Sequence, residues 1–371
     1  MDHGHISSAQ ARVNTVLAAV QHTNFRSFGD ITPVDETIRA AALRRLDVLT
    51  KPLGSLGRLE SLAAQVCAIQ RSLDIRISEP SGIVFAADHG AAEHGVSAYP
   101  REVTAQMVAN FLHGGAAISV LAKLQGVELW IVYAGVAGEC RAHSRLIDAK
   151  IRPGTRNFIV EPAMTPEECA AALQLGSEIV GRVMPAAGNT LVLGEMGIGN
   201  TASAAMLMHG LTGRALIDCI GRGTGLDDQG LERKKQLLGQ ALSRRAPPTD
   251  PLSLLAEYGG YEIAMLTGAI MAGAARGALI LVDGFTVTVA AALAVKLDPS
   301  VLNYCVFAHC SAEHAHRALL QYLRVQPLLD LGMRLGEGSG AAVALPVVRA
   351  AVSLFSEMAT FEGAGVSNKD A

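Results

Sequence analysis

Short apolar runs alternate with longer stretches of helical pattern along most of the chain. The runs carry Val, Ile and Leu at consecutive positions, which is typical of strands buried on both faces of a parallel sheet. A glycine-rich or polar turn follows each run, and a helix-like segment follows the turn. This rhythm predicts repeated strand–helix units, with strands at residues 81–87, 128–133, 190–193, 215–219, 278–282 and 304–308.

These units predict an α/β fold, in which a Rossmann-like parallel sheet with flanking helices binds its ligand at the carboxyl ends of the strands. The first 75 or so residues carry helical patterns without a comparable strand, and the stretch from Ala341 is helical as well. We expect both ends of the chain to form one small helical domain. The predicted domains are a catalytic domain at 76–345 and a helical domain at 1–75 with 346–371.

The composition of the chain limits the kinds of partner that we expect it to bind. Half of the 371 residues are hydrophobic, only 18 % are charged, and the net charge is -3. A chain without a long basic run has nothing to attract nucleic acid or an anionic membrane. Glycines and Arg276 break the apolar run 264–282, which favours a core helix and a strand over a membrane span. We therefore expect no nucleic-acid or membrane partner.

The cysteines and the N-terminus indicate a cytoplasmic protein. The N-terminus lacks a charged segment followed by an apolar stretch, so we predict no signal peptide. Scattered cysteines in apolar surroundings are typical of reduced core residues. None of the six forms a C-x-x-C pair: Cys67, Cys140, Cys169, Cys219, Cys305 and Cys310.

The first of three glycine-rich turns, GEMGIGNT at 194–201, follows a predicted strand and precedes an alanine-rich helix. Exposed backbone N–H groups and the positive end of a helix dipole make such a turn an anion site. The spacing resembles a P-loop, but Asn200 stands where a nucleoside triphosphatase needs Lys. A monophosphate is therefore the predicted ligand.

The same turn also fits the pattern G-x-G-x-x-A through Gly197, Gly199 and Ala202, with Asp218 at the end of the next predicted strand. That pattern is typical of an NAD-dependent dehydrogenase, although Glu195 would lie close to the pyrophosphate. The glycines can also serve only to let a helix pack closely on a strand. From these residues alone, a dehydrogenase and a non-catalytic nucleotide-binding protein both remain alternatives.

The second turn, GRGTGLDD at 221–228, ends in two acids. They invite comparison with the diphosphate–Mg²⁺ loop of ordinary phosphoribosyltransferases, but the threonine- and glycine-rich continuation is missing. Asp227 or Asp228 is the predicted N-cap of a helix that carries three successive cations at 233–235. One of these cations can lean back toward the anion site, or all three can lie on a solvated face.

The third turn, RLGEGSGA at 334–341, places Glu337 between two glycines. Glycine neighbours cost backbone entropy and supply no side-chain contacts, but they allow a substrate to approach the backbone. Glu337 is therefore the leading candidate for a catalytic group, and a solvated turn is the alternative. The clusters around His89 and His309 lack a zinc-protease spacing, so we expect no metal and no cofactor.

Together the motifs resemble one family, the nicotinate-nucleotide–dimethylbenzimidazole phosphoribosyltransferases. The resemblance extends over about residues 45–345 and does not include the first 30 or so. One departure is Tyr133, where the family tends to have Asp. The matching segments are LDVLTKPLGSLGRLE (46–60), FAADHGAAEHGVSAYPREVTAQMVANFLHGGAA (85–117), LGEMGIGNT (193–201), GRGTGLDD (221–228), DGF (283–285), AHCSAEHAH (308–316) and PLLDLGMRLGEGSGAA (327–342).

The resemblance implies transfer of the 5-phosphoribosyl group of nicotinate mononucleotide to 5,6-dimethylbenzimidazole, which gives α-ribazole 5′-phosphate for the lower ligand of cobalamin. It also implies a homodimer whose partner subunit helps to close the site. It assigns Glu337 as the general base. It further assigns the nucleotide site to Glu195, Gly197, Gly199, Asn200 and Lys234, and the benzimidazole pocket to Ser97, Tyr99 and Gln106.

Overall fold

A computed structural model describes residues 28–139 and 142–367. The ends of the predicted helical domain at 1–27 and 368–371, and Cys140, lie outside the described residues. The core is one six-stranded parallel sheet in the order β3-β2-β1-β4-β5-β6. Its strands are β1 Ser81–Ala87, β2 Glu128–Gly135, β3 Leu146–Asp148, β4 Thr190–Met196, β5 Leu279–Val282 and β6 Cys305–Phe307.

Five of the six predicted strands are confirmed, and the one at 215–219 is wrong. Its last four residues form a short helix, α8 (Leu216–Cys219), which the bond from Asp218 N–H to the Ala215 carbonyl oxygen begins. A run of five residues, four of them apolar, fits a helix or a strand equally well. No place beside β4 is open to such a strand, because β1 and β5 pair with its two edges.

The helices cover both faces of the sheet, as the complete burial of β1 requires. Helix α11 contacts four strands and packs on α6 and α12. Helices α4, α5 and α14 form a second group against the strands. The remaining bounds are α2 Glu36–Asp47, α3 Arg58–Gln70, α4 Val103–Leu112, α5 Ala117–Gln125, α6 Pro166–Val183, α7 Asn200–Thr212, α9 Asp228–Arg244, α10 Pro251–Tyr258, α11 Tyr261–Ala275, α12 Phe285–Leu297, α13 His316–Tyr322, α14 Ser339–Glu357 and α15 Phe361–Ala364.

Two glycines explain how closely α6 and α11 pack. A Cβ at Gly176 would lie 2.0 Å from the carbonyl oxygen of Met265, and a Cβ at Gly268 would lie 1.9 Å from that of Leu173. Any side chain at either position would push the two helices apart. The alanine- and glycine-rich sequence therefore builds a dense helical layer over the sheet.

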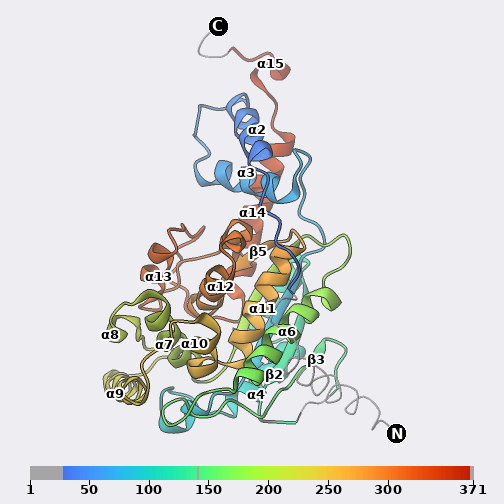
Figure 1. The fold of residues 1–371 in the computed structure, drawn as a ribbon. Helices are drawn as coiled ribbons and strands as arrows, with labels where there is room; N and C mark the ends of the chain where they lie inside the picture. The colour runs from blue at the N-terminus through green and yellow to red at the C-terminus, as the bar shows by residue number, and fades with distance from the viewer. Residues whose placement is uncertain (1–27, 140–141, 368–371) are drawn as a thin grey trace.

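Both chain ends contribute to one helical group, which Figure 1 shows in blue and red beyond one end of the sheet. Helix α3 packs on α2 and on α14, and a β-bridge joins Leu49 to Thr360. Helix α14 also contacts β4 and β5 and runs without a break across residue 345. The domain boundaries at 75/76 and 345/346 stay a prediction.

Two stretches of the described residues are long and apolar enough to cross a membrane by length and composition alone, Val103–Gln125 and Ser339–Glu357. The first is interrupted, because α4 ends at Leu112 and α5 begins at Ala117. Each part is shorter than the ~20 residues that a span needs. The second is α14, which packs on α3, α5 and the sheet as a core helix does.

Candidate active site

The strand order reverses between β1 and β4, since β2 and β3 lie on one side of this pair and β5 and β6 on the other. This is the topological switch point, where open α/β sheets bind ligands. Here the first turn meets the end of β1 at close range. A Cβ at Gly197 would lie 2.5 Å from the carbonyl oxygen of Ala87. Gly199 has φ +96° and precedes α7, so both glycines are required by the backbone.

The third turn lies directly against the first. The backbone N–H of Glu337 donates to the carbonyl oxygen of Glu195 at 3.2 Å. A Cβ at Gly194 would lie 2.2 Å from the carbonyl oxygen of Glu337, and a Cβ at Gly336 would lie 2.9 Å from Glu195 Oε1. Glu337 itself has φ +66°, a strained conformation for a residue with a side chain. The fold therefore brings the two predicted carboxylates to one place.

Asp283, directly after β5, holds the third turn. Its fully buried carboxylate accepts from the backbone N–H of Gly338 at 3.2 Å and of Ala341 at 3.0 Å, at the start of α14. His309 Nε2 lies 3.7 Å from Asp283 Oδ1. Burial raises the pKa of Asp283, while His309 and the backbone donors oppose that rise. Asp283 was not among the predicted site residues, although an acid directly after a buried strand was a usable signal.

Glu337 is a buried carboxyl group with a free oxygen. Only 5 % of the residue is exposed, and Oε2 has no hydrogen-bond partner among the described residues. Burial raises the pKa of Glu337 to about 7; Asp283 adds to the rise, and a hydrogen bond from the backbone N–H of Ile118 opposes it. Ile118 lies at the start of α5, and a backbone donor of this kind leaves no signal in sequence. A base with such a pKa is matched to proton transfer at neutral pH.

Glu195 is a second buried carboxyl group with a raised pKa. Asn200 Nδ2 donates to Glu195 Oε2 within the first turn. Burial raises the pKa of Glu195 to about 8, and the neighbouring carboxylates Glu262, Asp283 and Glu337 raise it further against the opposing bond from Asn200. Glu195 is therefore mostly protonated at neutral pH. A neutral Glu195 removes the repulsion that a carboxylate would exert on a nearby phosphate.

Lys234 leans back toward the anion site and is fully buried. Its Nζ donates to Thr201 Oγ1 at 2.9 Å, in the first turn of α7, and to the carbonyl oxygen of Gly221 at 3.1 Å. Burial lowers the pKa of Lys234 to about 8, and Glu313 opposes this. Asp227 is the N-cap of α9, since its Oδ1 accepts from Gly230 N–H at 2.7 Å. The solvated-face alternative is thus wrong for Lys234.

The residues predicted for the benzimidazole lie on the segment between β1 and α5. Ser97 Oγ is 3.0 Å from Thr224 Oγ1 in the second turn. Tyr99 and Gln106 are exposed. Helix α4 reaches the first turn through Thr104 Oγ1, which accepts from Ile198 N–H at 3.2 Å. The roles of Ser97, Tyr99 and Gln106 stay predictions.

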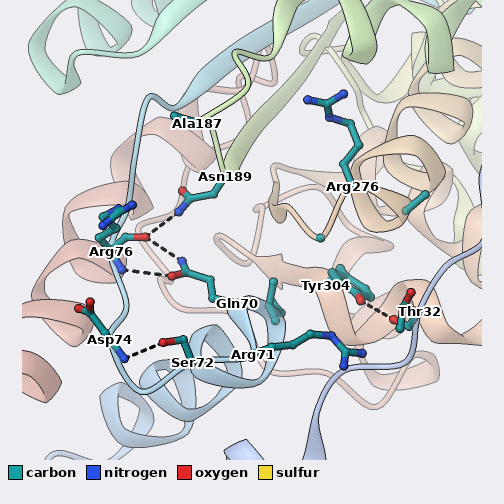
Figure 2. Close-up of a pocket in the computed structure, with 13 residues that line it drawn as sticks. Thr32, Gln70, Arg71, Ser72, Asp74, Arg76, Ala187, Asn189, Arg276 and Tyr304 are labelled. Atoms are coloured by element: carbon teal, nitrogen blue, oxygen red, sulfur yellow. Dashed lines mark hydrogen bonds between the residues drawn. The ribbon is translucent and has the colours of Figure 1, made fainter.

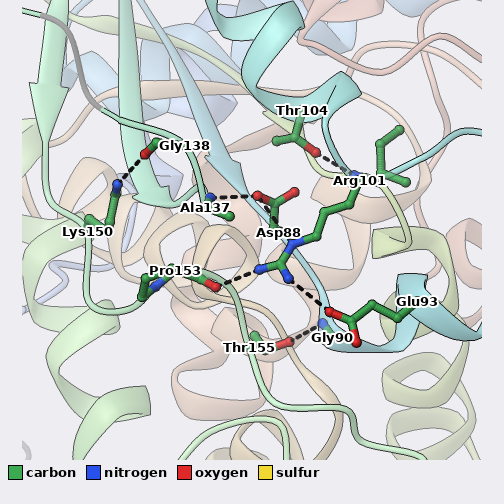
Figure 3. A network of polar contacts seen from close by, with 11 residues as sticks. Asp88, Gly90, Glu93, Arg101, Thr104, Ala137, Gly138, Lys150, Pro153 and Thr155 are labelled. Atoms are coloured by element: carbon green, nitrogen blue, oxygen red, sulfur yellow. Dashed lines mark hydrogen bonds and ion pairs between the residues drawn. The ribbon is translucent and has the colours of Figure 1, made fainter.

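A polar network fixes the start of this segment (Figure 3). Asp88 Oδ2 accepts from Ala137 N–H at 2.7 Å and lies 3.6 Å from Arg101 Nε. Arg101 also donates to Glu93 at 3.1 Å and to the carbonyl oxygen of Pro153 at 2.6 Å. Tyr133, where the resemblance led us to expect Asp, is buried at the end of β2. The chain after β1 is therefore tied to the chain after β2.

A cavity of about 600 Å³ opens at the other end of the strands, away from the three glycine turns (Figure 2). It lies near the amino-terminal ends of β4 and β5, where Asn189 and Gly277 line it, and it contains Arg71, Arg76 and Arg276. None of the predicted site residues lines it. Among residues 28–139 and 142–367, no group of three or more His, Cys, Asp and Glu side chains has the arrangement of a metal site.

A family model described as phosphoribosyltransferase matches residues 31–366. A nicotinate-nucleotide–dimethylbenzimidazole phosphoribosyltransferase of Cupriavidus necator is 54 % identical over 340 residues, 92 % of this chain and 98 % of the relative. A protein of the same name from Dechloromonas aromatica is 51 % identical over 344 residues, 92 % of this chain and 99 % of the relative. A crystal structure of that enzyme from Thermus thermophilus is 42 % identical, with a TM-score of 0.86 over 90 % of this chain and 99 % of the other.

The dehydrogenase alternative loses its acidic residue, since Asp218 lies in α8 and not at the end of a strand. The relatives and the family model instead cover nearly the whole chain, including all three glycine turns. With this fold and this similarity, the chain belongs to the nicotinate-nucleotide–dimethylbenzimidazole phosphoribosyltransferase family.

Proposed function

We propose that the protein transfers the 5-phosphoribosyl group of nicotinate mononucleotide to 5,6-dimethylbenzimidazole. The products are α-ribazole 5′-phosphate and nicotinate, and the former supplies the lower-ligand nucleotide of cobalamin. The observation that carries the proposal is Glu337, a buried carboxyl group at the switch point of the sheet whose Oε2 has no partner within the part of the chain that the structure describes. The names of the relatives over most of the chain support the same substrates.

The first turn and Lys234 bind the phosphate in this proposal. The backbone at Gly197 and Gly199 leads into α7, whose N-terminus attracts an anion. The Lys234 ammonium lies at the same helix end through its bond to Thr201. Glu195 in its protonated form, together with Asn200, then contacts the ribose without repelling the phosphate.

Glu337 removes the proton that the reaction releases. One nitrogen of the benzimidazole bonds to the anomeric carbon, and the electron pair of the breaking C–N bond returns to the pyridinium ring. The ring leaves without an acid because it loses its positive charge as it departs. The other benzimidazole nitrogen gives its proton to Glu337 Oε2. Attack opposite the leaving ring inverts the anomeric carbon from β to α, and positioning of the two rings supplies much of the remaining rate.

Ser97, Tyr99 and Gln106 line the benzimidazole pocket in this scheme. Two contacts support this assignment. Ser97 forms a hydrogen bond with Thr224, and α4 forms one with the first turn through Thr104. Helix α5 follows α4 directly and donates to Glu337 from Ile118. The segment that carries the three residues is thereby linked to both the nucleotide turn and the base.

We also propose that the protein is a cytoplasmic homodimer without a nucleic-acid partner. Helix α5 carries two large apolar side chains in the open, Val120 at 57 % and Leu124 at 73 % exposure. Apolar groups one helical turn apart favour a protein contact. The mass in solution tests this: the wild type should have the mass of a dimer, and Leu124→Glu should be a monomer. A monomeric wild type would contradict it.

The decisive experiment mixes the purified protein with nicotinate mononucleotide and dimethylbenzimidazole in EDTA. Mass spectrometry and NMR should identify α-ribazole 5′-phosphate with the α configuration. Nucleotide binding without turnover would favour a non-catalytic binding protein. Activity that EDTA abolishes and a single metal restores would overturn the proposed metal-free reaction.

A further inference from the structure

A fully buried histidine lies beneath the first turn and connects two helices. His89 Nε2 is 2.6 Å from Glu262 Oε1 on α11, and its Nδ1 is 3.0 Å from Ser203 Oγ on α7. His89, Ser203 and Glu262 are all completely buried. Ser203 in turn donates to the carbonyl oxygen of Gly259 at 3.3 Å. The three side chains form one chain of hydrogen bonds from α7 to α11.

The imidazole also packs against the glycines of the nucleotide turn. A Cβ at Gly197 would lie 3.4 Å from His89 Cδ2 and Nε2, and a Cβ at Gly199 would lie 3.4 Å from His89 Cβ. On the other side, a Cβ at Gly260 would lie 2.4 Å from His89 Cε1. Gly260 therefore leaves room for this ring on the α11 side, and the ring and its Cβ lie in contact distance of Gly197 and Gly199 on the other side.

Glu262 has one carboxyl oxygen that the contact with His89 leaves free. Its Oε2 has no hydrogen-bond partner among the described residues, although the residue is completely buried. A buried oxygen without a partner is costly unless it serves a purpose. Glu262 is the strongest charged neighbour of Glu195 and raises its pKa, ahead of Asp283 and Glu337.

We propose that His89 and Glu262 are positioning residues for the nucleotide substrate. His89 supports the turn that carries Gly197 and Gly199, and Glu262 holds the His89 ring in place through their 2.6 Å contact. Neither side chain is required to touch the reacting atoms. This inference rests on the proposed function, because it concerns the binding of nicotinate mononucleotide.

The groups that face Glu195 define how its proton responds to pH. Glu262 comes from α11, Asp283 from the end of β5, and Glu337 from the turn before α14. His89 pairs with Glu262 and His309 lies beside Asp283. Of Glu262 and Asp283, the two carboxylates that lie beside a histidine, Glu262 raises the pKa of Glu195 more. Removing its charge should therefore let Glu195 ionise at a lower pH.

The test measures nicotinate mononucleotide binding by calorimetry, and KM and kcat by product formation. His89→Ala should raise Kd and KM for the nucleotide about tenfold or more and change kcat less than about threefold, since the loss lies in substrate binding. His89→Gln keeps a nitrogen donor for Glu262 and should recover at least about a third of the lost affinity. Ser203→Ala, which removes one bond, should have a smaller effect.

Glu262→Gln has a distinct signature in the pH dependence. Wild-type nucleotide binding should weaken as the pH rises past about 8, when Glu195 ionises and Lys234 loses its proton. In Glu262→Gln this loss should begin at least about half a pH unit lower, because a like charge has been removed from beside Glu195. Low pH should therefore restore binding to this variant. A purely structural defect would not show this recovery.

Thr267→Val is the matched control on α11. It removes the buried bond from Thr267 Oγ1 to the Ile263 carbonyl oxygen, on a part of the helix that packs against α12. It should leave the nucleotide Kd unchanged. If His89→Ala does not fold, Ser203→Ala and Glu262→Gln still decide the question.

The inference is overturned if the wild type is active while all soluble variants bind the nucleotide normally, or if Thr267→Val weakens binding as much as they do. An unshifted pH dependence in Glu262→Gln overturns the role of its charge. A wild type that neither binds nicotinate mononucleotide nor forms product would instead contradict the proposed function.

Discussion

Glu337 donates its backbone N–H to the backbone oxygen of Glu195, so that the predicted base and the nucleotide turn are joined by a bond of 3.2 Å. The two residues are far apart in sequence: Glu195 lies in β4, and Asp283, directly after the neighbouring strand β5, holds the turn that carries Glu337. Any shift of the nucleotide turn therefore moves the base as well. In the proposed reaction, this bond links nucleotide binding to the position of the base.

Gly194→Ala should disturb that link. The new methyl group would lie 2.2 Å from the carbonyl oxygen of Glu337, and a backbone atom cannot move away as a flexible side chain can. Overpacking of this kind typically costs about 1–3 kcal/mol. We expect a lower melting temperature and a kcat reduced at least about tenfold, because Glu337 is displaced. Gly181→Ala, which has no atom within 4 Å of its added Cβ, is the control and should behave as the wild type.

Lys234→Ala should weaken use of the nucleotide substrate. A charge-assisted bond to phosphate contributes roughly 1.5–3 kcal/mol, so kcat/KM for the nucleotide should fall about ten- to a hundredfold. Lys235 offers a matched control, since it is the next residue on α9 and pairs with Glu232 at the surface. Lys235→Ala should leave kcat/KM within about twofold. Equal effects of the two changes would remove Lys234 from the phosphate site.

Sequence predicts most of the fold because buried parallel strands are apolar at consecutive positions, as β1 is throughout. It fails where a segment is too short to have a period. The three residues of β3 gave no signal, and the strand predicted from five residues at 215–219 is mostly a helix. In both cases tertiary pairing, not local pattern, decides the structure.

The residues of the candidate site also differ in how far the sequence predicts them. Glu337 was predictable because glycines on both sides of a carboxylate are hard to explain by packing. Lys234 was ambiguous, since three successive cations do not reveal which one turns inward. The pair His89–Glu262 had no signal at all, because its members are 173 positions apart and meet only when the sheet forms.

The pH dependence of kcat/KM should be a narrow bell. Glu337 must be ionised to accept a proton, so activity should rise as the pH passes about 7. Glu195 must stay protonated to avoid repelling the phosphate, so activity should fall as the pH passes about 8. Because the two groups interact, the profile reports apparent values for the pair. A rate that is constant between pH about 6 and 9 would contradict both assignments.

Glu337→Gln keeps the shape of the side chain and removes the basic carboxylate. General-base assistance typically contributes about 10²–10⁴ in rate, which corresponds to roughly 3–5 kcal/mol of barrier. The variant should fold normally and bind both substrates with near wild-type affinity, because the proton moves only in the transition state. Its kcat should be at least about a hundredfold lower.

Two further measurements make this test specific to base catalysis. The residual activity of Glu337→Gln should lose the acidic limb of the pH profile, since the group that titrates near pH 7 is gone. A more acidic azole, whose N–H is easier to lose, should suffer less from the change than dimethylbenzimidazole. If the variant kept more than about a tenth of the wild-type kcat, the base would lie elsewhere. Glu195 would then be the next residue to replace, since its carboxyl group lies beside Gly336.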